Sequence, residues 1–183
     1  MVTVKTLAPT PPFTREGEEA VLGCMLWERE AAEIALETLI KDDFFDQFHV
    51  NVFQTIQQLY LQNKPVDVHG VEIEMSRQNL LDSFMEKGAY VANLHSLSHK
   101  FSTAAHVRDY IKVVKDYSIL RNLASRCTEI VRSCYEHEEE AKIILEKAEK
   151  HIYSLSDNGN PQQLIMIKEH LTETIEMIEE ASR

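Results

Sequence analysis

The longest regular pattern in the sequence is a run of apolar residues that step by three and four positions between Thr103 and Leu155. Steps of three and four place side chains on one stripe of an α-helix, whereas a half-buried strand needs steps of two. The first arm of the run ends at Cys134, an acidic stretch follows over residues 136–140, and the stepping then resumes. We therefore predict a hairpin of two long antiparallel helices over residues 103–155, joined by a short acidic turn.

The apolar stripe of this hairpin is a candidate surface for self-association. An apolar stripe usually packs inside its own fold, and the second arm could cover the first completely. Further apolar positions lie beside the stripe, at Val107, Ile111, Val114, Ile119, Leu123 and Ile130. Together they exceed what one partner helix covers, so we predict packing between copies of the chain. The predicted contact residues are Tyr110, Val113, Tyr117, Leu120, Ala124, Cys127, Val131, Ala141, Leu145, Ala148 and Ile152.

The residues before the hairpin are predicted to form a small helical core over residues 13–102. Prolines 9, 11 and 12 lack backbone donors, so residues 1–12 are expected to be an extended arm. Thr14 and Asp67 are expected to be N-caps of the first and fourth helices. Apolar spacing predicts helices over about 14–27, 34–39, 49–61, 67–75 and 89–97. No stretch keeps a two-residue alternation, so the predicted fold is all-α, without a sheet.

The end of the chain has its own pattern. Residues 156–161 are almost all turn formers and predict a flexible linker over 156–163. A last amphipathic helix is predicted over 164–183, and the rest of the chain offers nothing to cover its apolar face. We expect that face to dock on a partner through Leu164, Ile167, Leu171, Ile175 and Ile178.

The charge balance disfavours nucleic acid as a direct ligand. The chain has 30 acidic and 19 basic residues, a net charge of −11, which would repel a phosphate backbone. Its 3 cysteines form no C-x-x-C pair, and no signal peptide or membrane span stands out. We predict a cytoplasmic protein that binds neither nucleic acid nor membrane.

Three groups of side chains have residue types that carry chemistry in other proteins. They are His95, His99 and His106, the acids Asp42, Asp43 and Asp46, and the hydroxyls of Ser154 and Ser156. No cysteine or carboxylate stands at a spacing that would complete a metal site with the histidines. The acids have no accompanying nucleophile, so we expect them to cap helices or face solvent, and we interpret the serines as ordinary linker residues. A metal-dependent enzyme is the weakest hypothesis, and we predict no catalytic, cofactor-binding or metal-binding residue.

Several short motifs occur in order between residues 11 and 155. They are Pro11-Pro12 with Glu18-Glu19-Ala20-Val21-Leu22-Gly23, Phe44-Phe45 with His49 and Phe53, Lys64-Pro65-Val66-Asp67, Gly88-Ala89-Tyr90-Val91-Ala92-Asn93-Leu94, Tyr110-Ile111-Lys112-Val113-Val114-Lys115 with Leu120-Arg121, and Ala148-Glu149-Lys150. In this order they resemble the N-terminal domain of DnaB-type replicative DNA helicases. Residues 164–178 are similar in pattern to the linker helix of that family.

The resemblance implies a role in assembly and recruitment. In the family, hairpins of neighbouring subunits pair into dimers, three dimers form the collar of a hexamer, primase docks on the collar and a helicase loader engages nearby. The family's linker helix docks on the adjacent motor domain, which uses ATP and Mg for 5'–3' unwinding. The 183 residues contain no glycine-rich phosphate loop, so we expect no catalysis by this chain alone. A free-standing adaptor or regulator of the same fold, which binds a helicase or primase, is the alternative.

Overall fold

The computed structural model of the chain describes residues 10–80, 87–100, 104–136 and 140–156. Among these residues, 7 α-helices and one 3-10 helix are present and no strand occurs, which confirms the predicted all-α fold. The predicted linker over 156–163 lies outside the described residues beyond Ser156, as does the whole of the last helix with Leu164, Ile167, Leu171, Ile175 and Ile178.

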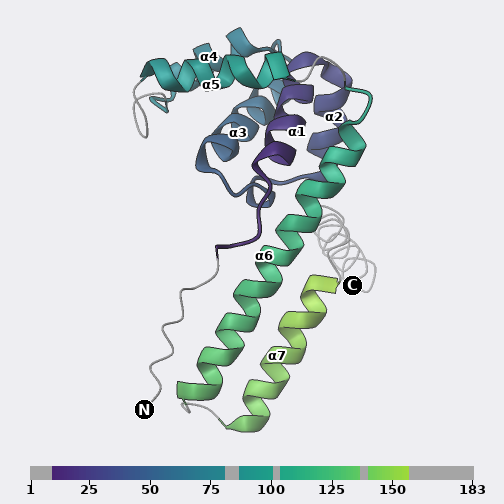
Figure 1. Cartoon of the computed structure of the whole chain (residues 1–183), viewed down its shortest axis with the longest axis vertical. Helices are drawn as coiled ribbons and strands as arrows, with labels where there is room; N and C mark the ends of the chain where they lie inside the picture. The colour runs from purple at the N-terminus through teal and green to yellow at the C-terminus, as the bar shows by residue number, and fades with distance from the viewer. Residues whose placement is uncertain (1–9, 81–86, 101–103, 137–139, 157–183) are drawn as a thin grey trace, which may run out of the picture. The chain divides into compact units, whose positions relative to one another are not determined.

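The helices follow the order that the apolar spacing predicts (Figure 1). Their bounds are α1 Arg15–Trp27, α2 Arg29–Thr38, η1 Lys41–Asp43, α3 Gln47–Leu61, α4 Val68–Arg77, α5 Lys87–Lys100, α6 Val107–Glu136 and α7 Ala141–Ser156. The chain divides into two compact units, residues 1–121 and residues 122–183, and the boundary falls within α6. The predicted boundary between the core and the hairpin at residues 102/103 stays a prediction.

Side chains cap the starts of three helices in the first unit. The Thr14 hydroxyl accepts from the backbone N–H of Gly17 at 3.1 Å, and Asp67 accepts from Gly70 at 2.7 Å. Both predicted caps are confirmed, because these side chains satisfy donors that have no partner within the helix. Asp46 caps α3 in the same way, so α3 begins at Gln47, two residues earlier than predicted.

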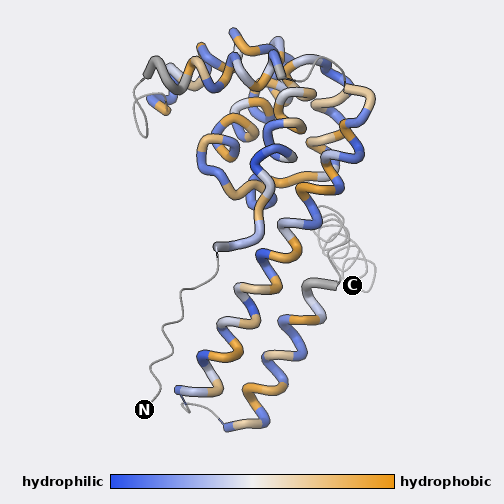
Figure 2. The backbone as a smooth tube through the Cα atoms, in the orientation of Figure 1, coloured by the Kyte–Doolittle hydropathy of each residue, from blue (hydrophilic) through white to orange (hydrophobic). Residues whose placement is uncertain are grey.

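The core of the first unit is built around α1, which packs against α2, α3 and α5. Consecutive α1 residues are fully buried from Val21 to Leu22 and from Cys24 to Met25, so this helix is covered on more than one face. Apolar segments of the surrounding helices converge on it (Figure 2). An apolar core of this kind stabilises the unit without a partner.

The first turns of α6 belong to this core. Val107, Ile111 and Val114 are buried in the same cluster as the α1 side chains. We expected these three residues to add surface beside the hairpin stripe, and that expectation is wrong. A helical apolar pattern looks the same whether its face packs inside the fold or against another molecule.

The second unit contains the C-terminal half of α6 and α7, and the two helices run antiparallel (Figure 1). Apolar positions recur along both helices (Figure 2). None of the side chains described between residues 122 and 154 is buried. Within its described part, the second unit therefore lacks a core of its own.

No helix in the described ranges is both long enough and apolar enough to cross a membrane.

Candidate functional site

A buried carboxylate joins the starts of α1 and α3. Glu18, only 1% exposed, accepts hydrogen bonds from the backbone N–H groups of Phe45 at 2.8 Å and Asp46 at 3.3 Å. Its other contact is with Nδ1 of His49, at 2.8 Å, and that imidazole is also buried. A buried carboxylate needs partners of this kind, since transfer from water without them is costly. Glu18 thus fixes the loop that precedes α3 against α1.

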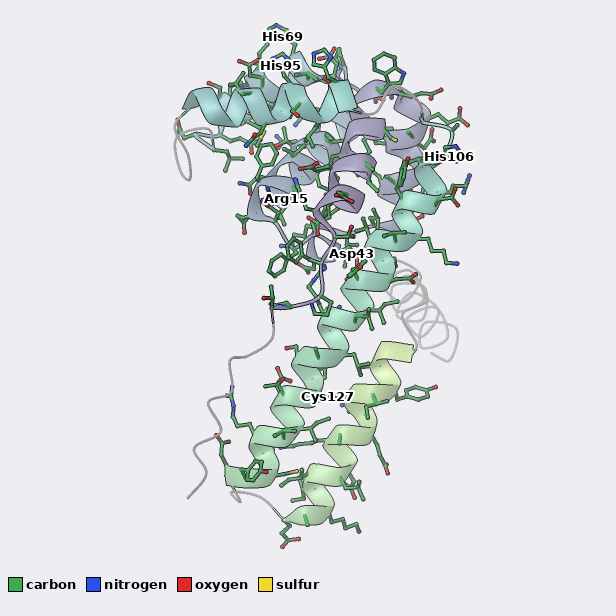
Figure 3. All side chains as sticks on the ribbon, viewed as in Figure 1. Arg15, Asp43, His69, His95, His106 and Cys127 are labelled. Atoms are coloured by element: carbon green, nitrogen blue, oxygen red, sulfur yellow. The ribbon has the colours of Figure 1, made fainter. Side chains whose placement is uncertain are left out.

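A second buried carboxylate ties that loop to α6. Asp43 accepts from the backbone N–H of Ile40 at 2.8 Å and from Nζ of Lys115 on α6 at 2.9 Å. Asp43 is labelled in Figure 3 and is 3% exposed. Our expectation of capping or solvated acids therefore holds for the cap at Asp46 and the exposed Asp42. Asp43 also caps, since it accepts from Ile40 at the start of η1, but it is in addition a buried ion-pair partner.

Arg121 adds a third connection between the core and α6. Its guanidinium donates to the carbonyl oxygens of Pro12, at 3.2 Å, and of Asp43. The same group lies 5.8 Å from the ring centre of Phe45, which stacks on Phe13 at 4.8 Å. Burial lowers the pKa of Arg121, and the carboxylates of Glu18 and Asp43 act in the opposite direction. These contacts hold the first turns of α6 firmly on the helical core.

The predicted contact residues of the hairpin stripe lie mostly at the surface. In the first unit Leu120 is 49% exposed and Val113 is also exposed, whereas Tyr110 and Tyr117 are half-buried and Tyr110 packs partly on the core. In the second unit Leu145 is 60% exposed. The exposed residues there also include Ala124, Cys127, Val131, Ala141 and Ile152, and Ala148 is half-buried. The stripe is therefore accessible to a partner along most of its length.

The other candidate residues do not converge. His95 lies 3.9 Å from Glu72 and His106 lies 3.5 Å from Asp109, and Figure 3 shows the two histidines well apart. His99 is exposed on α5. Across the described ranges, no three histidine, cysteine or acidic side chains are placed to hold a metal ion.

The predicted linker serines lie at the end of α7. The hydroxyl of Ser154 donates to the carbonyl oxygen of His151 at 2.8 Å, and the backbone of Ser156 forms the last residue of the helix. This contact is local to one helix turn and leaves the hydroxyl without a catalytic partner in the described residues.

The polar network around Glu18 and His49 is the part of the site that we did not predict. Glu18 precedes Val21 and Leu22 by three and four positions, and His49 precedes Val52 and Phe53 by the same steps. Each polar residue therefore continues an apolar stripe into the core. A charged or polar residue on the apolar face of a helix predicts that its side chain is buried and pairs with another polar group. This signal was available in the sequence.

Comparisons with known proteins agree with this architecture. A family model described as DnaB-like helicase N terminal domain matches residues 10–116. The replicative DNA helicase DnaC of Bacillus subtilis is 33% identical over 170 residues, which is 93% of this chain and 37% of that protein. The replicative DNA helicase DnaB of Geobacillus stearothermophilus is 31% identical over 92% of this chain and 36% of its own length. The chain thus spans little more than a third of these relatives.

A solved structure extends the likeness to three dimensions. The crystal structure of the N-terminal domain of DnaB helicase from Mycobacterium tuberculosis superposes with a TM-score of 0.71 at 31% identity, over 80% of this chain and 99% of that one. The sequence resemblance, the family match and this fold agree, and the chain belongs to the family of the DnaB-like helicase N-terminal domain.

Proposed function

We propose that this chain is the collar portion of a hexameric replicative DNA helicase, and that its hairpin pairs neighbouring subunits. The observation that carries the proposal is the absence of any buried side chain among those described between residues 122 and 154. Two helices that expose leucine, isoleucine and valine side chains lack the apolar burial that stabilises helices in water.

Pairing of two hairpins supplies that burial. Val131 is 54%, Leu145 60% and Ile152 52% exposed, and each loses most of this exposure when a second hairpin covers the stripe. Complete burial of such a side chain contributes about 1.5–3 kcal/mol, and these three are partly buried already. Burial of a whole stripe of this length matches the apolar contacts of stable homodimers.

The anchored first turns of α6 suit this role. Lys115 and Arg121 hold the first turns of α6 on the core through Asp43 and its neighbours, so this part of the helix is fixed within the first unit. A partner that binds the exposed residues of the helix then pays little ordering entropy at these turns. We infer that the core is a rigid mount for the pairing helix.

Membership in this family supports a wider role in the assembly of the helicase and in the recruitment of other proteins. In this proposal three hairpin dimers form a collar, primase docks on the collar, a loader engages nearby, and the assembly acts in the cytoplasm. The segment with Leu164, Ile167, Leu171, Ile175 and Ile178 docks on a neighbouring motor domain, where ATP and Mg drive unwinding. The acidic net charge of −11 suits a collar that holds proteins and does not itself grip DNA.

A matched pair of variants tests the pairing. Leu145→Glu places a charge in the stripe, and Ile143→Glu places the same charge two positions away, on another side of α7, at a residue that is 42% exposed. We expect Leu145→Glu to weaken self-association at least about tenfold, and Ile143→Glu to leave it near wild type. Sedimentation velocity over a concentration series measures both.

Two results would count against the proposal. One is a wild-type chain that stays monomeric at high micromolar concentration. The other is equal association of the Leu145→Glu and Ile143→Glu variants, because the stripe would then have no part in the contact.

A further inference from the structure

A hollow between α3 and the end of α4 is lined mainly by amide side chains and lies within the first unit. Its volume is about 450 Å³. Leu61, which is 73% exposed, and the half-buried Leu80 form its apolar surface. None of its lining residues in the described ranges is charged, although 27% of the chain is charged. The amide side chains that line it are Asn51, Gln54, Gln57, Gln58, Gln62 and Gln78.

Hydrogen bonds between α3 and α4 hold one wall of this hollow in place. Nε2 of Gln78 donates to Oε1 of Gln58 at 2.7 Å. Both amides also donate to the carboxylate of Glu74, each at 3.3 Å. Glu74 is only 7% exposed and pairs with Arg77 at 3.3 Å. Two of the lining amides are therefore positioned before a ligand arrives, which reduces the entropy lost on binding.

Three other lining amides are available to a ligand. The side chains of Gln54, Gln57 and Gln62 make no hydrogen bond with any residue in the described ranges. Each of these amides offers two N–H donors and one carbonyl acceptor. The hollow thus combines fixed amides with amides that are free to pair.

Asn51 supplies an independent sign that the hollow receives a ligand. The residue is 6% exposed, and its Oδ1 accepts from Nε2 of Gln47 at 3.0 Å. Its Nδ2 is buried and is the one buried side-chain nitrogen or oxygen without a partner in the described part of the first unit. A buried donor without an acceptor destabilises a fold, and such donors are rare. A carbonyl oxygen bound in the hollow supplies the acceptor that Asn51 lacks.

The spacing of the amides along α3 matches an extended peptide. Gln54, Gln58 and Gln62 are four residues apart, so they recur about every 6 Å along the helix. Groups on one side of an extended chain recur every two residues, which is about 6.6–6.8 Å. The mismatch is less than about 1 Å per step, and the rotatable bonds of glutamine absorb it. From Asn51 to Gln62 the helix rises about 16 Å, the length of about five extended residues.

The uncharged wall decides the class of ligand. Phosphates and nucleotides are held mainly by cationic groups, and the described lining residues offer none. A peptide bond carries one donor and one acceptor, the same two kinds of group that an amide side chain presents. Amides at a two-residue spacing therefore complement the main chain of an uncharged segment.

We propose that this hollow binds an uncharged segment of about five residues of another protein in an extended conformation. The amides of α3 pair with main-chain N–H and C=O groups of the segment, and one of its apolar side chains packs on Leu61 and Leu80. The contact uses α3 and α4 and no residue of the hairpin stripe. It therefore goes beyond the proposed pairing of hairpins and does not depend on it.

Isothermal titration calorimetry of the full chain with a blocked peptide tests the proposal. The probe is acetylated and amidated Ser-Leu-Thr-Leu-Ser, and the control peptide has the same side chains with methyl groups on its main-chain nitrogens. We expect a Kd below about 1 mM for the probe and at least about tenfold weaker binding of the control, which has lost its main-chain donors. Added salt should change the affinity less than about twofold, because no ion pair is involved.

Matched variants locate the binding to the hollow. Gln54→Glu with Gln62→Glu keeps the size of two exposed side chains but removes their donors, and we expect at least about tenfold weaker binding. Ser76→Glu adds a charge at an exposed position of α4 outside the lining and should leave the affinity within about twofold of wild type. Asn51→Leu removes the unpartnered donor and should also weaken binding. If Asn51→Leu does not fold, the two exposed changes still decide the question.

Several results would overturn the inference. They are a probe that does not bind below about 1 mM, equal binding of the methylated peptide, and unchanged affinity after Gln54→Glu with Gln62→Glu. Binding of a single-stranded oligodeoxyadenylate in place of the peptide would also overturn it, since the amides would then recognise base edges. The Leu145→Glu variant should bind the probe as wild type does. Failure of hairpin pairing is therefore observed separately from failure of this site.

Discussion

Replacement of Glu18 by alanine is expected to destabilise the first unit strongly. The change leaves three groups without their partner, which are the backbone N–H groups of Phe45 and Asp46 and Nδ1 of His49. A buried donor left without a partner costs about 1–3 kcal/mol. Since the Asp46 bond is long, at 3.3 Å, and water can enter in part, we expect a loss of about 3–5 kcal/mol. That is a large fraction of the roughly 5–15 kcal/mol that stabilises a domain.

Urea unfolding followed by tryptophan fluorescence measures the effect. Trp27 is the only tryptophan of the chain and lies at the end of α1, so its emission reports on the first unit alone. The matched control is Glu16→Ala, which removes an exposed acid from the same first turn and costs about 0.3–1 kcal/mol through the helix dipole. Midpoints convert to free energies when the slopes agree.

A conservative change keeps the test informative if Glu18→Ala does not fold. Glu18→Gln retains one acceptor oxygen but turns the other into a donor, so we expect a smaller loss of about 1–2 kcal/mol. If Glu18→Ala and Glu16→Ala shift the midpoint equally, the buried acceptor does not stabilise the unit. The description of the junction between α1 and α3 would then be wrong.

Three further predictions follow from single contacts. Arg121→Lys should destabilise the first unit by about 1–2 kcal/mol in the same unfolding assay, because an ammonium cannot donate to two separated carbonyls as the guanidinium fork does. Gly70→Ala should cost about 1 kcal/mol or more, since the added Cβ would lie 2.8 Å from the carbonyl oxygen of Pro65; a midpoint at or above wild type would contradict this. A thiol reagent should modify the exposed Cys127 quickly and leave Cys24, whose pKa is raised by burial, unmodified until unfolding. If hairpins pair, the reaction at Cys127 slows as protein concentration rises, and mass spectrometry of the modified peptide measures that rate.

Local signals in the sequence predicted the helices well. Thr14 and Asp67 were recognisable as caps because their side chains precede apolar helical patterns, and both accept the expected hydrogen bonds. The start of α3 was placed two residues late because its apolar pattern begins at His49, although Asp46 was among the acids expected to cap a helix. The residue at which a helix begins can depend on one hydrogen bond from a side chain, which composition alone does not reveal.

Long-range partners were harder to predict. Asp43 and Lys115 are 72 positions apart, and Arg121 reaches the carbonyl of Pro12 across 109 positions. Nothing in the spacing of these residues marks them as neighbours. The burial of Val107, Ile111 and Val114 was missed for a related reason. Periodicity shows that a helix has an apolar face, but it does not show what covers that face.

The contrast between the two units shows what the hairpin stripe requires. The first unit buries its apolar side chains around α1 and needs no partner for stability. In the second unit α7 has 16 residues, and an isolated helix of that length is marginal in water. Its side chains are not buried among the described residues, and in the proposed collar a second hairpin would bury them. Folding of the second unit is then linked to assembly by mass action, and a collar built from it gains stability as subunits associate.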